Sequence, residues 1–329
     1  ADRGLSVTLI DEASRPGGVC LHRGCIPSKA LLHAAKVLTD ARQASGFGVS
    51  FGKPSIDLDQ LRGWKNDVVA KLTGGLAQLS KQRKVTYIQG RAAFDDARTV
   101  TVTSNDASET LTTITFEHAI IATGSRPARP SALVLDDPRV LDSTDALKLE
   151  RIPSSLLVIG GGYIGLEIGS VYAALGTVVT IVEMAQNLLP GADADLVGVL
   201  ARRINQVTDK VHVQTTVTSL AALRDGIAST LEGPGVGILT ETYDNVLVAV
   251  GRIPNSDVPG LDKTRVKRDA HGFIVVDAQR RTAESSIFAI GDVAGEPMLA
   301  HKAFAEARVA VDAVTGGSAT FKSHAIPAI

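Results

Sequence analysis

Cysteine, aromatic residues and net charge are all scarce in this sequence, and each scarcity excludes a class of protein. Two cysteines among 329 residues are too few for a disulfide-stapled secreted fold or an all-cysteine zinc site. Thirty-four basic residues against 35 acidic ones leave a net charge of −1, so nothing predicts a nucleic-acid partner or an anionic membrane surface. Aromatic residues make up 4% of the chain, whereas 31 residues are glycine, which favours an α/β protein with tight glycine turns.

One apolar run, residues 156–182, is long enough to cross a membrane and has Glu167 as its only charge. Six glycines interrupt it, and its period changes from a short β-branched run to helical spacing and back. The run therefore predicts a buried strand, a glycine turn, a helix and a second strand, and no membrane span.

An internal repeat organises the chain. Residues 1–12 (ADRGLSVTLIDE) align with residues 173–184 (AALGTVVTIVEM) at a constant offset of 172, which places Asp11 on Glu183. The second copy follows a strand, a glycine turn and a helix, whereas the first copy has none of these before it. We therefore expect an α/β fold of two nested dinucleotide-binding domains with parallel sheets, the first one incomplete by about 17 residues at its N-terminus.

Periodicity and turn residues predict the remaining elements. Helices are expected over residues 27–39, 57–81 and 298–315, and strands over residues 5–10, 85–88, 93–94, 99–103, 110–116, 118–122, 273–276 and 287–290. The expected domain boundaries fall near residues 150, 270 and 316.

A glycine-rich motif opens the helix in the second copy of the repeat. Residues 160–165 read GGGYIG, which contains GxGxxG directly after the expected strand, with Glu183 lying 18 residues beyond the last glycine. In this context glycines let the backbone approach a pyrophosphate, and the acid accepts hydrogen bonds from an adenosine ribose. Because Glu183 would repel a 2′-phosphate, NAD is favoured over NADP. The alternative interpretation is a purely structural glycine turn.

The two cysteines, Cys20 and Cys25, are separated by four residues beside glycines and Pro27. In one regular helix they would be about 7.5 Å apart along the axis, whereas bridged cysteines need Cα atoms about 4.4–6.8 Å apart, so a bridge requires a local bend. A helix N-terminus with Arg23 and Lys29 nearby favours thiolates. Two inert core residues are the alternative, and a metal site is disfavoured because His22 alone cannot complete a ligand set.

Residues 17–35, GGVCLHRGCIPSKALLHAA, resemble the redox segment of the dihydrolipoamide dehydrogenases, which are two-dinucleotide-binding disulfide oxidoreductases. Three further segments agree with the same family: ATGSRP at 122–127, GRIPN at 251–255 and GDVAGEPMLAHK at 291–302. The resemblance implies FAD and NAD as cofactors. It also implies that residues 1–150 and 271–316 bind FAD, that residues 151–270 bind NAD, and that residues 317–329 begin an interface domain otherwise absent.

The resemblance also implies roles for individual residues. The catalytic set would be Cys20, which exchanges disulfides with the substrate, Cys25 against the flavin, and the pair Lys29 and Glu167 near the flavin ring. FAD would contact Asp11, Gly17, Gly18, Lys29, Ala92, Gly124, Gly291, Asp292, Met298, Leu299, Ala300 and His301. NAD would contact Gly160, Gly161, Gly162, Tyr163, Ile164, Gly165, Glu183, Val217 and Gly251. Without the family, Lys29 could be only a first-turn helix residue and Glu167 an exposed one.

The reaction implied by the resemblance is oxidation of a dithiol, dihydrolipoamide, through a redox-active disulfide and FAD to NAD. The implied partners are a lipoyl carrier domain of a 2-oxoacid dehydrogenase or glycine cleavage complex and a second copy of the parent chain. The implied compartment is the cytoplasm, or the mitochondrial matrix in a eukaryote.

The sequence departs from the family at both ends. The usual first GxGxxG is missing, and His324 stands in SHAIPAI, a context that gives it no role as a base. We therefore expect this chain to be inactive by itself. The alternative functions are an isolated NAD-binding module and another reductase of the same superfamily, of the mercuric or soluble pyridine nucleotide type.

Overall fold

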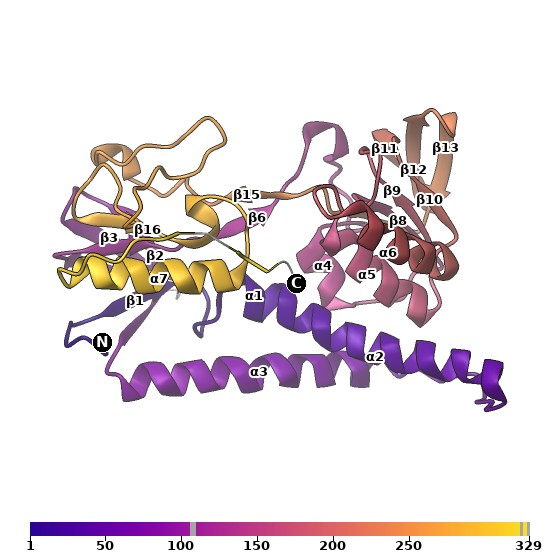
Figure 1. Ribbon diagram of the computed structural model, residues 1–329, viewed down its shortest axis with the longest axis horizontal. Helices are drawn as coiled ribbons and strands as arrows, with labels where there is room; N and C mark the ends of the chain where they lie inside the picture. The colour runs from indigo at the N-terminus through magenta and orange to yellow at the C-terminus, as the bar shows by residue number, and fades with distance from the viewer. Residues whose placement is uncertain (106–109, 323–324, 328–329) are drawn as a thin grey trace. The chain divides into compact units, whose positions relative to one another are not determined.

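The computed structural model describes residues 1–105, 110–322 and 325–327, and the chain divides into two compact units (Figure 1). Unit 1 comprises Ala1–Cys20, Leu72–Arg126 and Ile253–Ile329, and unit 2 comprises Leu21–Lys71 and Pro127–Arg252. The chain passes from unit 1 to unit 2 twice and returns each time, so the segments of the two units alternate along the sequence. The boundary between the compact units falls between Cys20 and Leu21, so Cys25 is assigned to unit 2. The domain boundaries near residues 150 and 270 stay a prediction.

Unit 2 is built around a five-stranded parallel sheet in the order β10-β9-β8-β14-β7. Its strands are β7 (Val140–Leu141), β8 (Ser155–Ile159), β9 (Val178–Val182), β10 (Lys210–His212) and β14 (Asn245–Val248). Strands β8 and β14 are buried almost along their whole length, since both faces of the sheet are covered. Burial on both faces explains why β8 is a continuous apolar run and does not alternate with polar residues.

Alternate residues of these strands face two different covers. Leu156, Val158 and Ile181 pack with α5 (Tyr163–Leu175) and α2 (Cys25–Gln43), and α4 (Ser143–Lys148) and α6 (Ala194–Val207) gather beside α5 (Figure 1). Leu157 and Val182 face an antiparallel sheet of β11 (Thr216–Ala222), β12 (Ile227–Gly233) and β13 (Gly237–Tyr243). The apolar run at 156–182 is thus strand, turn, helix and strand, and no helix within the described ranges is long and apolar enough to span a membrane.

Unit 1 contains two sheets that surround one core. The first has the order β1-β2-β3-β4, with β1 (Thr8–Asp11) and β2 (Thr86–Phe94) parallel and β3 (Thr99–Ser104) and β4 (Leu111–Thr115) antiparallel. The second pairs β5 (Ala119–Ile121) with β16 (Ile287–Ala289) in parallel. Phe94, Ile121 and Ile287 meet in the core. The α/β class with parallel sheets is therefore confirmed.

The remaining elements are three helices, of which α3 and α7 are long, and several short elements. The helices are α1 (Gly18–Arg23), α3 (Leu58–Gln82) and α7 (Ala300–Val314), and the single turns of 3₁₀ helix are η1 (Ala44–Phe47), η2 (Ser131–Leu133), η3 (Leu261–Lys263) and η4 (Gly291–Ala294). The chain also forms the two-stranded pair β6 (Ser125–Pro127) and β15 (Arg252–Pro254).

Two expected strand assignments are wrong. Residues 86–94 form the single strand β2, where two strands over 85–88 and 93–94 were expected. Strand β3 passes so close that a Cβ on Gly90 would lie 2.4 Å from the Thr103 carbonyl oxygen, which explains a glycine inside a strand. Residues 273–276 form only a single bridge, Arg268 to Ile274, because their amides donate to several different loops.

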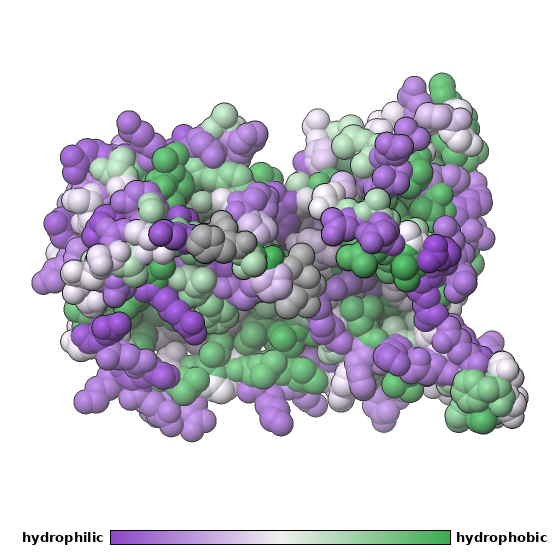
Figure 2. All heavy atoms as spheres, viewed as in Figure 1, coloured by the Kyte–Doolittle hydropathy of each residue, from purple (hydrophilic) through white to green (hydrophobic). Residues whose placement is uncertain are grey.

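The internal repeat is also present in three dimensions. Strand β1 pairs with β2 in parallel, as its copy β9 pairs with β10. Burial differs between the copies, however, because Ile181 in β9 is fully buried and its equivalent Leu9 in β1 is 37% exposed. Further large apolar side chains are exposed on α3, at Leu72, Leu76 and Leu79, and Figure 2 shows hydrophobic residues interrupting the hydrophilic surface there.

Candidate redox and dinucleotide-binding sites

The cysteine segment consists of two helices that meet at Gly24. Helix α1 ends at Arg23 and α2 begins at Cys25, while Gly24 has φ −140° and ψ −114° and belongs to neither. The bend that a bridge would need between Cys20 and Cys25 is therefore present. Cys20 is half-buried in α1, and Cys25 is exposed at the first position of α2. A helix N-terminus carries partial positive charge, which favours a thiolate at Cys25.

Lys29 and Glu167 form an ion pair within unit 2. The Lys29 Nζ lies 2.7 Å from Glu167 Oε1, and the two residues come from the adjoining helices α2 and α5. Ser28 completes the arrangement, since its hydroxyl donates to Glu167 Oε2 at 2.8 Å. The pairing removes the simpler interpretation of Glu167 as an exposed residue. Sequence reasoning quoted Ser28 only as part of a motif and gave it no role.

The glycines of the GGGYIG turn have two different roles: some allow close backbone packing, and one leaves the helix N-terminus open. A Cβ on Gly160, which has φ +110°, would lie 2.4 Å from the Ala249 carbonyl oxygen, and one on Gly165 would lie 2.1 Å from the Gly160 carbonyl oxygen. These two glycines permit the tight turn and the close packing of α5 on β8. Apart from its own chain neighbours, no described residue has an atom within 4 Å of a Cβ built on Gly162, the N-cap of α5. The backbone is thus open to a ligand only where a pyrophosphate binds at a helix N-terminus.

Glu183 ends β9 beside this turn and is only 8% exposed. Its Oε2 accepts a hydrogen bond from the Gly161 amide at 2.6 Å, and its Oε1 accepts one from the Ala185 amide at 2.6 Å. Backbone donors therefore fix the carboxylate next to the open helix N-terminus. This geometry suits an acceptor for ribose hydroxyls and opposes a 2′-phosphate.

The other residues predicted to bind NAD lie in different surroundings. Tyr163 is exposed at the start of α5 and Ile164 is partly buried, whereas the Val217 side chain is 4% exposed in the core between the sheets. Gly251, with φ +117°, accepts a hydrogen bond from the Ala128 amide through its carbonyl. A ligand could therefore meet Val217 only through its backbone.

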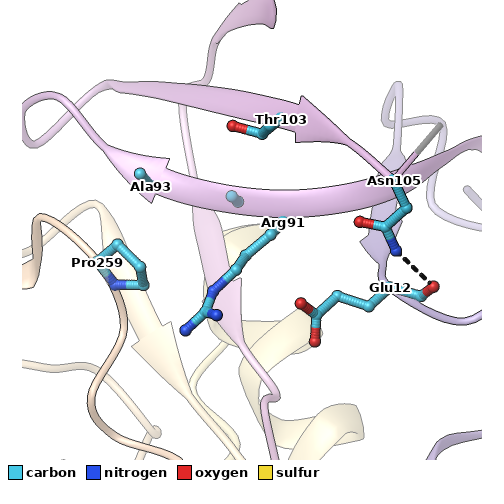
Figure 3. A pocket seen from close by; sticks show the side chains of 7 residues that line it. Glu12, Arg91, Ala93, Thr103, Asn105 and Pro259 are labelled. Carbon is cyan, nitrogen blue, oxygen red and sulfur yellow. Dashed lines mark hydrogen bonds between the residues drawn. The ribbon is translucent and has the colours of Figure 1, made fainter. Parts of the chain in front are cut away.

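A cavity in unit 1 adjoins the first copy of the repeat (Figure 3). It measures about 380 Å³ and is lined by Glu12, Arg91, Ala92, Ala93, Thr103, Asn105 and Pro259. The Glu12 side chain, just after β1, and the Arg91 side chain of β2 extend toward it, and the Asn105 side chain donates to the Glu12 carbonyl at 2.8 Å. The cavity therefore brings Ala92 close to the end of β1.

Asp11 is the last residue of β1, and its Oδ1 accepts a hydrogen bond from the Ala13 amide at 2.9 Å. The Tyr87 hydroxyl donates to the Ala13 carbonyl at 2.7 Å. Burial, followed by the charge of Asp11, raises the pKa of Tyr87 above its ordinary value. Gly17 and Gly18 lie between this turn and the cysteines, and Gly18 has φ +63° at the start of α1.

The segment around Asp292 lies in the core of unit 1. Asp292 follows Gly291 in η4, and the Ser125 hydroxyl donates to its Oδ2 at 2.6 Å. Gly124, with φ +69°, accepts a hydrogen bond from the Asn255 amide through its carbonyl. The structure thus brings together ATGSRP, GRIPN and GDVAG, three segments far apart in the sequence.

The residues from Met298 to His301 lead into α7, which begins at Ala300 after Leu299 as its N-cap. The His301 ring Nε2 lies 2.7 Å from the Pro327 carbonyl oxygen. His324 lies outside the described residues. Across the described part of the chain, no three His, Cys, Asp or Glu side chains are arranged to hold a metal ion.

Comparison with known proteins gives a consistent result. The sequence profile of the family described as "Pyridine nucleotide-disulphide oxidoreductase" matches residues 1–307. Dihydrolipoyl dehydrogenase of Haemophilus influenzae is 47% identical over 329 residues, which is all of this chain and 68% of that protein. Dihydrolipoyl dehydrogenase of Geobacillus stearothermophilus is 42% identical over 329 residues, which is 69% of its length.

Solved structures agree with the sequence matches. LpdA from Mycobacterium tuberculosis superposes with a TM-score of 0.86 at 25% identity, over 98% of this chain and 69% of that one. The HOCl-induced flavoprotein disulfide reductase RclA from Escherichia coli superposes with a TM-score of 0.82 at 26% identity, over 97% of this chain and 68% of that one. The fold is therefore that of the flavoprotein disulfide reductases.

Proposed function

This chain belongs to the pyridine nucleotide-disulphide oxidoreductase family, and from that membership we propose that its site residues serve the dihydrolipoyl dehydrogenase reaction. The observation that carries the proposal is the combination of Cys20 and Cys25 around the Gly24 break with the Lys29–Glu167 pair. In this reaction the thiolate of a dithiol substrate attacks Cys20 Sγ, and Cys25 Sγ leaves as a thiolate with the electron pair of the broken S–S bond. The second substrate thiol then displaces Cys20, so the substrate leaves as a disulfide and both cysteines are reduced.

Members of this family use FAD and NAD, and the residues present fit both groups. For NAD, the open helix N-terminus at Gly162 and the fixed carboxylate of Glu183 would hold the pyrophosphate and the adenosine ribose. For FAD, the cavity against Ala92 and the Asp11 carboxylate would hold the adenosine, and Asp292 would hold the polyol chain. Bound FAD supplies the acceptor that takes two electrons from the dithiol and gives a hydride to NAD.

The chain's own residues serve this transfer by position and charge. Lys29 places a positive charge that stabilises negative charge as the flavin is reduced, and Glu167 orients the Lys29 amine. Ser28 holds the other Glu167 oxygen, so the carboxylate cannot turn away from the lysine. At the NAD turn, Glu183 keeps the Gly161 amide fixed.

The proposed partners follow from the same reaction. Dihydrolipoamide is carried on a lipoyl domain, so the partner would be the lipoyl carrier of a 2-oxoacid dehydrogenase or glycine cleavage complex. A second copy of the parent chain would form a homodimer. The proposed compartment is the cytoplasm, or the mitochondrial matrix in a eukaryote.

Thiol counting tests the proposal directly, because the chain has only two cysteines. The FAD-loaded, oxidised protein should show no thiol reactive to a disulfide reagent under denaturing conditions, and one equivalent of NADH should expose two. The Cys20→Ser and Cys25→Ser variants should show one thiol before and after NADH. Two thiols in the oxidised protein, or none after the flavin has been reduced, would exclude the proposed relay.

A further inference from the structure

Glu306 is a fully buried acid on α7 to which no role has been given so far. Its side chain is 0% exposed, and it lies 3.0 Å from Arg280 Nη1 and 3.4 Å from Lys302 Nζ. A buried carboxylate is costly unless it is paired and hydrogen-bonded, and the buried Lys302 and the partly buried Arg280 meet that requirement here. The same carboxylate also makes a contact outside this ionic cluster.

That contact fixes the turn that carries Asp292. Glu306 Oε2 accepts a hydrogen bond from the Gly291 amide at 2.5 Å, and Lys302 Nζ donates to the Gly291 carbonyl at 3.1 Å and to the Gly295 carbonyl at 2.7 Å. Both polar backbone groups of Gly291 are thus held by side chains one helical turn apart on α7. Charged partners make these hydrogen bonds stronger than neutral ones.

The backbone conformation at Gly291 is stabilised by these contacts with Glu306 and Lys302. Gly291 has φ +76°, and a Cβ there would lie 3.1 Å from the Ala303 Cβ of α7. The turn therefore takes a conformation open mainly to glycine and packs directly on the helix that bears Glu306. Asp292 follows at once, with its Oδ2 already bonded to the Ser125 hydroxyl. Glu306 and Ser125 together determine where the Asp292 carboxylate points.

We infer that Glu306 is a positioning residue for flavin binding, which holds the Gly291 turn so that Asp292 presents its carboxylate to the hydroxyls of the flavin's polyol chain. The inference rests on the proposed function in one respect, namely that FAD binds at Asp292. Lys302 has the complementary role of holding the carbonyl side of the same turn. Glu306 itself is buried beneath the turn and acts through Gly291 without touching the cofactor.

Hydrogen exchange in the protein without added FAD tests whether Glu306 holds the Gly291 turn. Glu306→Gln keeps an oxygen acceptor but removes the charge, so exchange across residues 291–294 should accelerate roughly tenfold or more, the factor that 1.4 kcal/mol gives. Lys302→Met removes the hydrogen bonds to the Gly291 and Gly295 carbonyls, so it should also accelerate exchange of these amides. This second variant serves as the test if Glu306→Gln does not fold. Arg308→Gln, at an exposed position of the same helix, is the matched control and should leave them unchanged. Unchanged exchange in both buried variants would overturn the inference.

FAD affinity tests whether this hold on the turn supports cofactor binding through Asp292. Glu306→Gln and Asp292→Asn should each raise the dissociation constant for FAD of the apoprotein. The double variant should raise it by less than the product of the two single-variant factors, because both substitutions act through the Asp292 carboxylate. Independent, multiplicative effects would show that Glu306 is only structural. NADH binding to unit 2 should stay unchanged in all variants. If the unaltered protein fails to bind FAD, the proposed function fails, whereas the exchange result still decides whether Glu306 holds the turn.

Discussion

At Glu183 one carboxylate holds the glycine turn and also faces the place where a ribose would bind. Replacement by alanine removes both the ribose acceptor and the partners of the Gly161 and Ala185 amides. We expect Glu183→Ala to weaken NADH binding roughly tenfold or more, because hydrogen bonds to charged groups contribute about 1.5–3 kcal/mol. Fluorescence titration with NADH measures the change. Glu232→Ala, at an exposed position of β12, is the control, and equal affinity in both variants would contradict the assignment.

The ion pair of Asp137 and Arg139 makes part of the stability of unit 2 depend on pH. Hydrogen bonding to Arg139 lowers the pKa of Asp137 from 3.8 to about 2. A carboxyl whose pKa is lowered on folding stabilises the protein above its unfolded pKa, and that contribution is lost as the pH falls through the folded pKa. The wild-type protein should therefore have a larger free energy of unfolding than Asp137→Asn at neutral pH, and the difference should vanish between pH 3.8 and 2. Urea unfolding across this range measures it, and a difference that grows toward low pH would refute the account.

Among the elements, helix α5 offers a matched pair of glycines. A Cβ on Gly165 would lie 2.1 Å from a backbone oxygen, whereas a Cβ on Gly169 would meet nothing closer than Val158 Cγ2 at 3.5 Å. Gly165→Ala should therefore destabilise unit 2 by about 1–3 kcal/mol or more, as overpacking does. Gly169→Ala should be neutral or stabilising by up to about 1 kcal/mol, because alanine favours a helix. Thermal unfolding compares them, and similar melting temperatures would show that α5 does not pack on β8 as described.

The elements that sequence reasoning predicted are those whose pattern is local. The strand, turn and helix at 156–175 follow from apolar periodicity and glycine spacing, and Gly24 breaks the helix where the cysteine spacing requires a bend. The continuous strand over 86–94 was not predicted, because its pairing with β3 and the close approach of β3 at Gly90 are contacts that local periodicity does not show. Ser28 and Glu306 were missed for the same reason, since their partners Glu167 and Gly291 are 139 and 15 residues away. The spacing of Lys302 and Glu306 was the one available signal, as it places both on one face of α7.

For the whole molecule, the two units should respond differently to NAD. All the residues proposed to bind NAD lie in unit 2. Ligand at about 100 times its dissociation constant stabilises the state it binds by about 2.7 kcal/mol. Saturating NAD should therefore slow hydrogen exchange in β8, α5 and β9, and leave β1 to β4 unchanged. Equal protection of both units would contradict a site confined to unit 2.

Electron exchange between Cys25 and a bound flavin can be observed in the absorption spectrum during anaerobic titration of the FAD-loaded protein with NADH. A thiolate next to oxidised flavin should give a long-wavelength band after two electrons have been added. In Cys20→Ser no disulfide can form, so the band should already be present before NADH is added and should disappear when two electrons reduce the flavin. In Cys25→Ser the band should be absent throughout. Flavin that is bleached in a single step, with no long-wavelength band in the unaltered protein, would contradict this electron exchange.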